Sequence, residues 1–172
     1  SSGWKGDQNL KVMCGGEALS YELAQQLIPK CSSLWNMYGP TETTIWSSVH
    51  RVAEHEKSIS IGKPIAGTQM FVLNELLQPV PVGVAGELYI AGDGVAQGYY
   101  GNTDLTNAQF QPNPFSSVDN ARMYKTGDLV RYALDMNLEY IGRMDFQVKV
   151  RGFRIETGEV ETVLGNYDSI AQ

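Results

Sequence analysis

The order of hydrophobic and polar positions in the first forty residues predicts a strand, a helix and a second strand. Residues 10–16 (LKVMCGG) alternate and then break at a glycine pair, which is typical of a buried strand that enters a loop. Apolar residues recur at helical spacing over residues 20–28, with Ser20 as the candidate N-cap and Pro29 as the stop. Residues 33–39 (SLWNMYG) predict a second short strand. This order indicates an α/β unit, in which ligands bind at the strand ends.

The pattern changes from about residue 58 onward. Short β-rich segments follow one another, separated by Gly, Pro and Asn, as in an antiparallel sheet or a small distorted barrel. One helix is predicted over residues 103–110, opened by Asn102 and early acidic charge. Later, QVKVRGFRI (147–155) alternates as a strand or hairpin, and residues 156–164 predict a final helix.

We therefore predict an α/β fold in three parts. Residues 1–57 form the end of a partial α/β sheet subdomain, residues 58–141 form a distorted antiparallel β-barrel subdomain, and residues 142–172 begin a small C-terminal α+β subdomain. The chain does not begin with Met and ends just after an amphipathic run with no closing element. We expect it to be a piece of a longer protein.

Composition and charge narrow the classes of partner. The formal net charge is −6, and Lys and Arg are scattered, which argues against a nucleic-acid-binding surface and against an anionic-membrane anchor. The sequence contains no apolar run near 18 residues and no signal-peptide pattern. The two cysteines, Cys14 and Cys31, lie in short apolar stretches, as free thiols of a reducing cytosol do. We predict a cytoplasmic protein with no nucleic-acid and no membrane partner.

The stretch NMYGPTETTIW (36–46) has two interpretations. As architecture it is a Gly-Pro turn that starts a new element, capped by Thr41 or Thr43. As chemistry it is a nucleotide and metal corner, because Tyr38 offers a ring to a base, Thr41 offers a hydroxyl to a phosphate, and Glu42 offers a hard oxygen ligand for Mg²⁺.

Other stretches have the same two kinds of interpretation. The glycine pair in VMCGGEALS either lets a ligand approach the backbone or makes a tight turn. Asp128 in YKTGDLVRY either accepts hydrogen bonds from two vicinal ribose hydroxyls or closes a β-turn. Lys149 and Arg151 lie on one face of a predicted strand, where they serve phosphates or protect an edge. Residues 92–98 (GDGVAQG) are glycine-rich but match neither common phosphate loop.

Four long motifs together resemble the core motifs of the adenylation domains of nonribosomal peptide synthetases, within the acyl-adenylate-forming superfamily. They are NMYGPTE, GELYIAGDGVAQGYY, YKTGDLVRY and GRMDFQVKVRGFRIETGEVE, in the family's order and over nearly the whole chain. The resemblance implies a ligase of secondary-metabolite biosynthesis. MgATP and an amino acid give aminoacyl-AMP and pyrophosphate, and the acyl group then passes to the phosphopantetheine thiol of a peptidyl carrier protein domain.

The resemblance also implies roles for individual residues. Thr41 contacts the α-phosphate, Glu42 holds Mg²⁺, Asp145 is the hinge of the mobile subdomain, and Lys149 belongs to the loop that swings toward the active site. The implied ATP- or AMP-binding residues are Gly16, Glu17, Ala18, Asn36, Tyr38, Gly39, Asp128 and Arg143.

The implied acyl pocket contains Met13, Gly15, Met37, Ile45 and Trp46, all uncharged, which favours an apolar or aromatic amino acid. Two departures from the family matter. The phosphate loop and the catalytic lysine of the family are not in these 172 residues, so we expect the isolated chain to be inactive. Met136 replaces a usual turn glycine and is strained if it needs a positive φ, unless Asn137 takes that conformation.

Two alternatives remain. The chain could belong to a stand-alone acyl- or aryl-CoA ligase, although GGEALS and the long C-terminal motif favour the peptide-synthetase branch. It could also be an inert nucleotide-binding or scaffold module.

Overall fold

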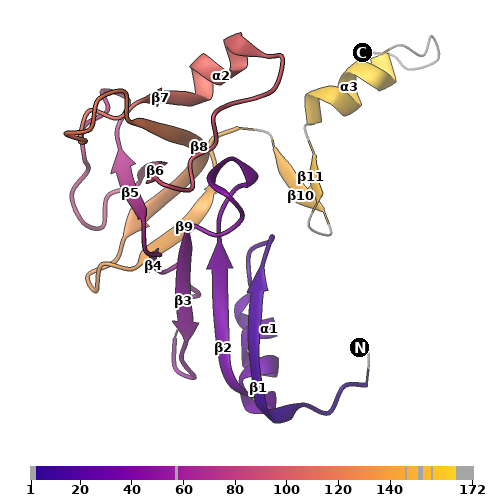
Figure 1. The fold of residues 1–172 in the computed structure, drawn as a ribbon. Helices are drawn as coiled ribbons and strands as arrows, with labels where there is room; N and C mark the ends of the chain where they lie inside the picture. The colour runs from indigo at the N-terminus through magenta and orange to yellow at the C-terminus, as the bar shows by residue number, and fades with distance from the viewer. Residues whose placement is uncertain (1–2, 57, 146, 151–152, 156, 166–172) are drawn as a thin grey trace.

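The computed structural model describes residues 3–56, 58–145, 147–150, 153–155 and 157–165. Within these residues, the N-terminal part forms a four-stranded sheet with α1 (Tyr21–Leu27) packed beside it (Figure 1). Strands β1 and β2 are parallel, and the other neighbours are antiparallel. In spatial order the strands are β1 (Asp7–Gly15), β2 (Cys31–Tyr38), β3 (Ser48–Val52) and β4 (Lys63–Pro64).

The predicted strand–helix–strand unit is confirmed. The side chain of Ser20 caps α1 by accepting a hydrogen bond from the Leu23 amide at 3.2 Å. Helix α1 gives way to a 3₁₀ turn, η1 (Ile28–Lys30), at Pro29. A core of Leu19, Ala24, Cys31, Leu34 and Val52 lies between α1 and the sheet. The opposite face of β1 and β2 carries Met13 and Gly15, so the helix leaves that face open.

The middle of the chain forms a curled antiparallel sheet. In the described residues it has five strands, with β5 beside β6, β6 beside β8, and β8 paired with both β7 and β9. The predicted helix is α2 (Thr103–Gln109), which Asn102 caps by accepting from the Leu105 amide at 3.0 Å. The strands are β5 (Thr68–Leu73), β6 (Gly86–Gly92), β7 (Phe110–Pro112), β8 (Arg122–Tyr132) and β9 (Leu138–Arg143).

The two sheets are joined by backbone and side-chain hydrogen bonds around Leu138. The Ile61 amide donates to the Leu138 carbonyl at 2.8 Å, and the Leu138 amide donates to the Gly62 carbonyl at 2.9 Å. Asn36 of β2 donates to the Ser60 carbonyl at 2.8 Å. Strand β4 pairs with β3 although it lies beyond residue 57, so the first sheet continues into the next sequence range. The division at residue 57 stays a prediction.

The C-terminal part begins with a hairpin of β10 (Val148–Val150) and β11 (Phe153–Ile155), followed by α3 (Thr157–Gly165). The α/β fold class, with a partial sheet, a distorted antiparallel sheet and the start of an α+β subdomain, is therefore confirmed. The side chain of Lys149 and the whole of residues 151–152 lie outside the described part of the chain. No helix among the described residues is long and apolar enough to cross a membrane.

Candidate functional site

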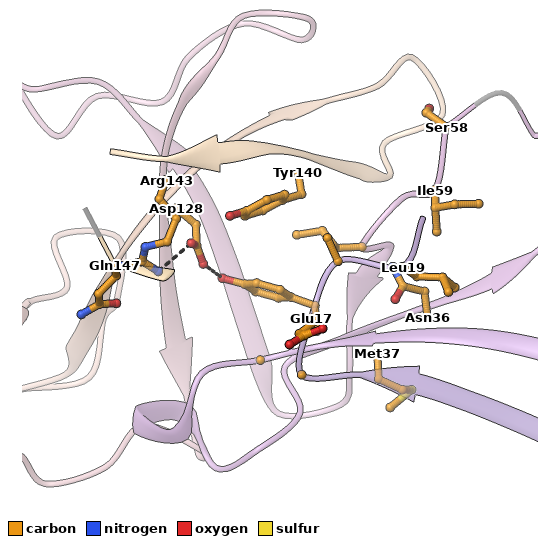
Figure 2. Close-up of a pocket in the computed structure, with 15 residues that line it drawn as sticks. Glu17, Leu19, Asn36, Met37, Ser58, Ile59, Asp128, Tyr140, Arg143 and Gln147 are labelled. Atoms are coloured by element: carbon orange, nitrogen blue, oxygen red, sulfur yellow. Dashed lines mark hydrogen bonds and ion pairs between the residues drawn. The ribbon is translucent and has the colours of Figure 1, made fainter. Parts of the chain in front are cut away.

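A pocket of about 540 Å³ lies where the ends of β1 and β2 meet β8 and β9 (Figure 2). This volume is within the usual range for small-molecule sites. The predicted residues that line it are Gly16, Glu17, Ala18, Asn36, Met37, Tyr38, Gly39, Asp128 and Arg143. Lining residues that sequence reasoning missed are Leu19, Ser58, Ile59, Ile61, Tyr140 and Gln147.

Asp128 is held at the centre of a hydrogen-bonded cluster. Its carboxylate accepts a hydrogen bond from the Tyr38 hydroxyl and another from Nη1 of Arg143, the latter at 2.7 Å. Asp128 is only 6% exposed, so this pairing offsets the cost of burying its charge. A carboxylate has room for more than two hydrogen bonds, so a ligand hydroxyl can still bind it.

An irregularity in β8 aims Asp128 into the pocket. Opposite Leu88 of β6, the pairing skips from Lys125 to Leu129, so three residues of β8 face one residue of its neighbour. Gly127, inside this bulge, has a φ of +73°, a conformation that favours glycine. A Cβ at Gly127 would lie 2.8 Å from Nη2 of Arg143. The Thr-Gly-Asp order therefore has a structural reason: glycine bends the strand and leaves room for the arginine.

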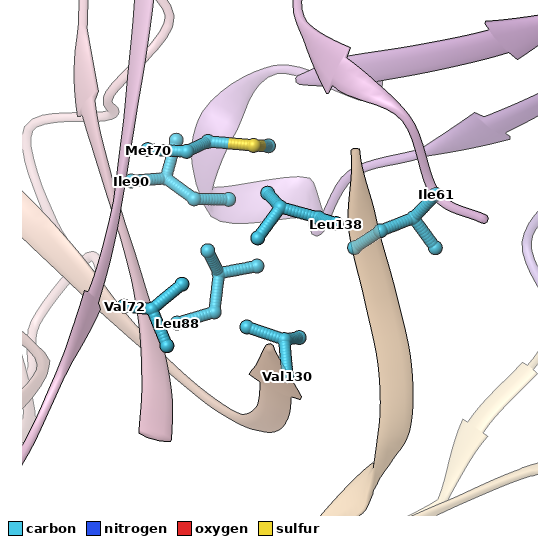
Figure 3. Close-up of a cluster of buried hydrophobic side chains, with 7 residues drawn as sticks. All are labelled: Ile61, Met70, Val72, Leu88, Ile90, Val130 and Leu138. Atoms are coloured by element: carbon cyan, nitrogen blue, oxygen red, sulfur yellow. The ribbon is translucent and has the colours of Figure 1, made fainter. Parts of the chain in front are cut away.

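The strand that carries Asp128 is anchored by a hydrophobic core. Val130, two residues further along β8, is fully buried in this cluster (Figure 3). The cluster consists of Ile61, Met70, Val72, Leu88, Ile90, Val130 and Leu138. Tyr38 packs against the same cluster from β2. Close packing restricts side-chain movement, so the core fixes both partners of the Tyr38–Asp128 hydrogen bond.

Arg143 connects the pocket to the predicted hinge residue Asp145. Its Nε and Nη2 atoms donate to the two carboxylate oxygens of Asp145, each at 2.6 Å, while Nη1 contacts Asp128. Burial tends to lower the pKa of Arg143, but the hydrogen bonds to Asp145 and the charges of both carboxylates outweigh it and raise the pKa above its usual value. Arg143 is therefore a fixed cation between two carboxylates.

Two tyrosines bring aromatic surface to the pocket. Burial, then the charge of Asp128, raises the pKa of Tyr38 well above its usual value, so its hydroxyl stays a donor. Tyr140 lies near Asp128 and Arg143 (Figure 2). In a regular strand Tyr140 and Arg143 would point to opposite faces, but the β8–β9 register shifts between Leu129 and Val130. Strict alternation therefore could not find Tyr140.

Thr41 and Glu42 do not line this pocket, because they lie in the adjoining 3₁₀ turn η2 (Thr41–Thr43). The prediction that Thr41 or Thr43 caps this element is wrong: η2 has no side-chain cap, and the Thr43 hydroxyl donates to the Pro40 carbonyl at 3.3 Å. Thr41 is exposed, whereas Glu42 is 7% exposed.

The carboxylate of Glu42 contacts a tyrosine that sequence reasoning missed. Oε1 of Glu42 accepts a hydrogen bond from the Tyr99 hydroxyl at 2.6 Å. Burial, then this hydrogen bond, raises the pKa of Tyr99. The described residues contain no cluster of three or more His, Cys, Asp or Glu that could hold a metal. A single carboxylate nevertheless fits Mg²⁺ that arrives with a nucleotide, because Mg²⁺ typically takes one or two carboxylates plus substrate phosphates.

The predicted acyl-pocket residues are only partly brought together. Gly15 pairs with Met37 in the parallel β1–β2 register, and a Cβ at Gly15 would lie 2.4 Å from the Trp46 ring. Met13 lies on the same face of β1 and is 61% exposed. Ile45 is 62% exposed with a φ of 71°, which is unusual for a β-branched residue. Gly15, Met37 and Trp46 form one surface, while Met13 and Ile45 lie at its exposed edges.

Comparison with known proteins identifies the family. The sequence profile described as "AMP-binding enzyme" matches residues 5–100. The chain is 51% identical over 166 residues to a dimodular nonribosomal peptide synthase of Bacillus subtilis (strain 168). This match covers 96% of this chain and 7% of that protein.

Solved structures similar to this chain come from the same group of proteins. A four-domain nonribosomal peptide synthetase bound to AMP and glycine is 51% identical, with a TM-score of 0.78, and the match covers 97% of this chain and 13% of that one. A protein with adenylation and PCP domains, bound to a vinylsulfonamide inhibitor, is 36% identical with a TM-score of 0.84 over 91% of this chain and 28% of that one. The chain thus spans a small part of the length of its relatives.

Proposed function

Because the chain belongs to the family of AMP-binding enzymes, we propose that it is a segment of an adenylation domain that activates an amino acid with ATP for nonribosomal peptide synthesis. The observation that carries this proposal is the pocket in which Tyr38, Asp128 and Arg143 form one hydrogen-bonded cluster. An aromatic ring beside a buried carboxylate suits the base and the ribose of a nucleotide. The relative bound to AMP and glycine supports this assignment.

In the first step, an oxygen of the amino-acid carboxylate attacks the α-phosphorus of ATP. The bond from that phosphorus to the bridging oxygen breaks, and pyrophosphate leaves with its electron pair. Little covalent chemistry falls to the protein, so the rate comes from positioning and from charge stabilisation. The Asp128 carboxylate accepts hydrogen bonds from the ribose hydroxyls, Arg143 adds positive charge beside them, and Tyr38 packs on the adenine.

The remaining nucleotide contacts come from β2 and from the segments that follow β1 and β2. The segment Gly16–Glu17–Ala18 forms one wall of the adenine pocket, and Asn36 and Gly39 line the pocket beside Tyr38. Thr41 orients the α-phosphate, and Glu42 would hold Mg²⁺. When bound there, Mg²⁺ would supply positive charge to the phosphates.

In the second step, the phosphopantetheine thiol of a peptidyl carrier protein attacks the acyl carbonyl carbon. The thioester C–S bond forms as the bond from that carbon to the phosphate oxygen breaks; AMP leaves with the electron pair, and the thiol proton passes to solvent. Asp145 serves as the hinge between the two steps, and Lys149 belongs to the loop that moves toward the site. The relative that contains both adenylation and PCP domains supports the carrier partner.

The amino acid is apolar or aromatic. The surface formed by Gly15, Met37 and Trp46, edged by Met13 and Ile45, contains no charged side chain to pair with a charged substrate group.

Nucleotide binding tests the proposal at Asp128. By isothermal titration we expect AMP to bind at least tenfold more tightly than 2′,3′-dideoxy-AMP, because charge-assisted hydrogen bonds to the ribose hydroxyls are worth roughly 1.5–3 kcal/mol each. Asp128→Ala should remove this preference. Asp119→Asn, an exposed carboxylate in the loop before β8, is the control and should keep it. Equal binding of both nucleotides by the unchanged protein would contradict the proposal.

A further inference from the structure

The glycine-rich segment 92–98, which matches no common phosphate loop, packs against the turn that carries Glu42. The Ala96 amide donates to the Glu42 carbonyl at 2.9 Å. A Cβ at Gly94 would lie only 2.9 Å from the Thr43 carbonyl oxygen, so a glycine permits this close approach. The segment 92–98 therefore packs closely against the turn η2.

Tyr99 follows this segment directly and reaches the Glu42 side chain. Its hydroxyl donates to Oε1 of Glu42 at 2.6 Å, between residues 57 positions apart in the sequence. This length is typical of a hydrogen bond to an ionised acceptor. The backbone contact at Ala96 and the side-chain contact at Tyr99 thus hold the same glutamate from one continuous stretch, residues 96–99.

The ring of Tyr99 is held in place by its own neighbours. It packs edge-on against the ring of Phe110, with centroids 5.5 Å apart and an interplanar angle of 70°. The Tyr99 amide donates to Oγ1 of Thr106 on α2 at 2.9 Å. A Cβ at Gly98 would lie 2.3 Å from the Thr106 side chain, so glycine lets the chain pass close to α2. The hydroxyl of Tyr99 is therefore placed by rigid elements.

We propose that Tyr99 is a positioning residue for Glu42, whose carboxylate its hydroxyl holds in the orientation that binds the Mg²⁺ of bound ATP. The inference rests on the proposed function. A phenylalanine would provide the same edge-on packing against Phe110, so the hydroxyl has a purpose beyond packing. Hydrogen bonds to metal-binding carboxylates fix their orientation, and loss of such a partner typically costs roughly 10–100-fold in metal affinity.

The test is the Tyr99→Phe variant of the full domain, in which nucleotide binding is measured instead of turnover. We expect the Mg²⁺ concentration for half-maximal ATP binding to rise about tenfold. Binding of AMP in EDTA should stay within about twofold of the unchanged protein, because Tyr38 and Asp128 are untouched. Tyr132→Phe is the matched control, since it removes another partly buried hydroxyl of the same part of the fold, one that donates to the Met70 carbonyl at 2.9 Å.

A double variant separates positioning from general structure. In a Glu42→Gln background, Tyr99→Phe should have little further effect on the Mg²⁺ requirement, because the two residues act as one unit. A second measurement keeps the hydroxyl in place. The ¹⁹F signal of 3-fluorotyrosine at position 99 should shift when Mg²⁺ is added to the ATP complex, whereas the signal of the same label at position 132 should not shift.

An unchanged Mg²⁺ requirement in Tyr99→Phe, with a raised one in Glu42→Gln, overturns the role of Tyr99 and leaves the proposed function intact. Equal loss of AMP binding in EDTA shows a structural role and also overturns it. If the unchanged protein binds AMP but its affinity for ATP does not depend on Mg²⁺, then Glu42 does not hold the metal, and the positioning role of Tyr99 is wrong as well. If it binds no nucleotide at all, the proposed function itself is wrong.

Discussion

Nη1 of Arg143 donates a hydrogen bond to Oδ1 of Asp128 at 2.7 Å, between residues paired directly across β8 and β9. The same guanidinium binds Asp145 through two further hydrogen bonds of 2.6 Å. The carboxylate expected to hold the ribose and the residue expected to act as hinge therefore share one arginine. A ligand that changes the contacts of Asp128 therefore also affects Arg143, which binds the predicted hinge residue Asp145.

Loss of this arginine should destabilise the fold. Arg143→Ala leaves the buried carboxylate of Asp128 with its Tyr38 contact but removes the guanidinium paired with it, and we expect the free energy of unfolding to fall by about 2–4 kcal/mol. Arg143→Lys, which keeps the charge but loses the planar fork, should cost less. Urea unfolding followed by circular dichroism measures both. Equal midpoints for Arg143→Ala and the unchanged protein would contradict this role of the pair.

Gly15 should tolerate no side chain. In Gly15→Ala the new Cβ would lie 2.4 Å from the Trp46 ring and 2.8 Å from the Met37 carbonyl oxygen, so the indole must move. We expect a loss of about 1–3 kcal/mol of stability and a changed tryptophan emission spectrum. Gly142→Ala is the control, because a Cβ there has no heavy atom within 4 Å. A Gly15→Ala variant with the native melting temperature and spectrum would show that the indole contact is loose.

Met136 is the place where a substitution should stabilise the chain. It adopts a φ of 64° in the turn between β8 and β9, so Met136 rather than Asn137 takes the left-handed conformation. Met136→Gly should raise the free energy of unfolding by about 0.5–1 kcal/mol, since relief of the left-handed cost outweighs the added freedom of glycine in the unfolded state. Met136→Ala truncates the same half-exposed side chain but keeps the strain, and it should give no such gain in thermal melting.

Tyr89 gives a pH dependence with a defined sign. Burial, then the charge of Glu87 and a hydrogen bond to it, raises the pKa of Tyr89 from 10.0 to about 12. Between these values the folded chain keeps a proton that the unfolded chain has lost, so this tyrosine makes the free energy of unfolding fall as the pH rises from 10 to 12. Stability curves of Tyr89→Phe should be flatter over this window. If the two proteins show the same pH dependence of stability over this window, the raised pKa of Tyr89 is contradicted.

The sequence predicted the elements well where one local pattern decides them. Helical spacing and the Ser20 cap located α1, and the Asn102 cap with early acidic charge located α2. Motif resemblance indicated Tyr38, Asp128 and Arg143, and the fold brings them into contact.

What the sequence did not predict depends on long-range or irregular geometry. Tyr140 enters the pocket through a register shift, which alternation cannot foresee. Tyr99 contacts Glu42 across 57 positions, and no local pattern records that contact. Ile45 is exposed and has a positive φ, in a turn where a Cβ at Gly39 would lie 2.4 Å from the Ile45 carbonyl oxygen, and no local pattern records this close approach.

The most direct test of the central claim is amino-acid-dependent exchange of pyrophosphate into ATP, measured on the full adenylation domain with a panel of carboxylic acids. We predict exchange with an apolar or aromatic amino acid, and loss of exchange in Asp128→Ala. Exchange with fatty or aryl acids alone would assign the domain to the acyl-CoA ligase branch. No exchange with any acid would contradict the account, and the pocket at Tyr38 and Asp128 would then belong to a nucleotide-binding module without this activity.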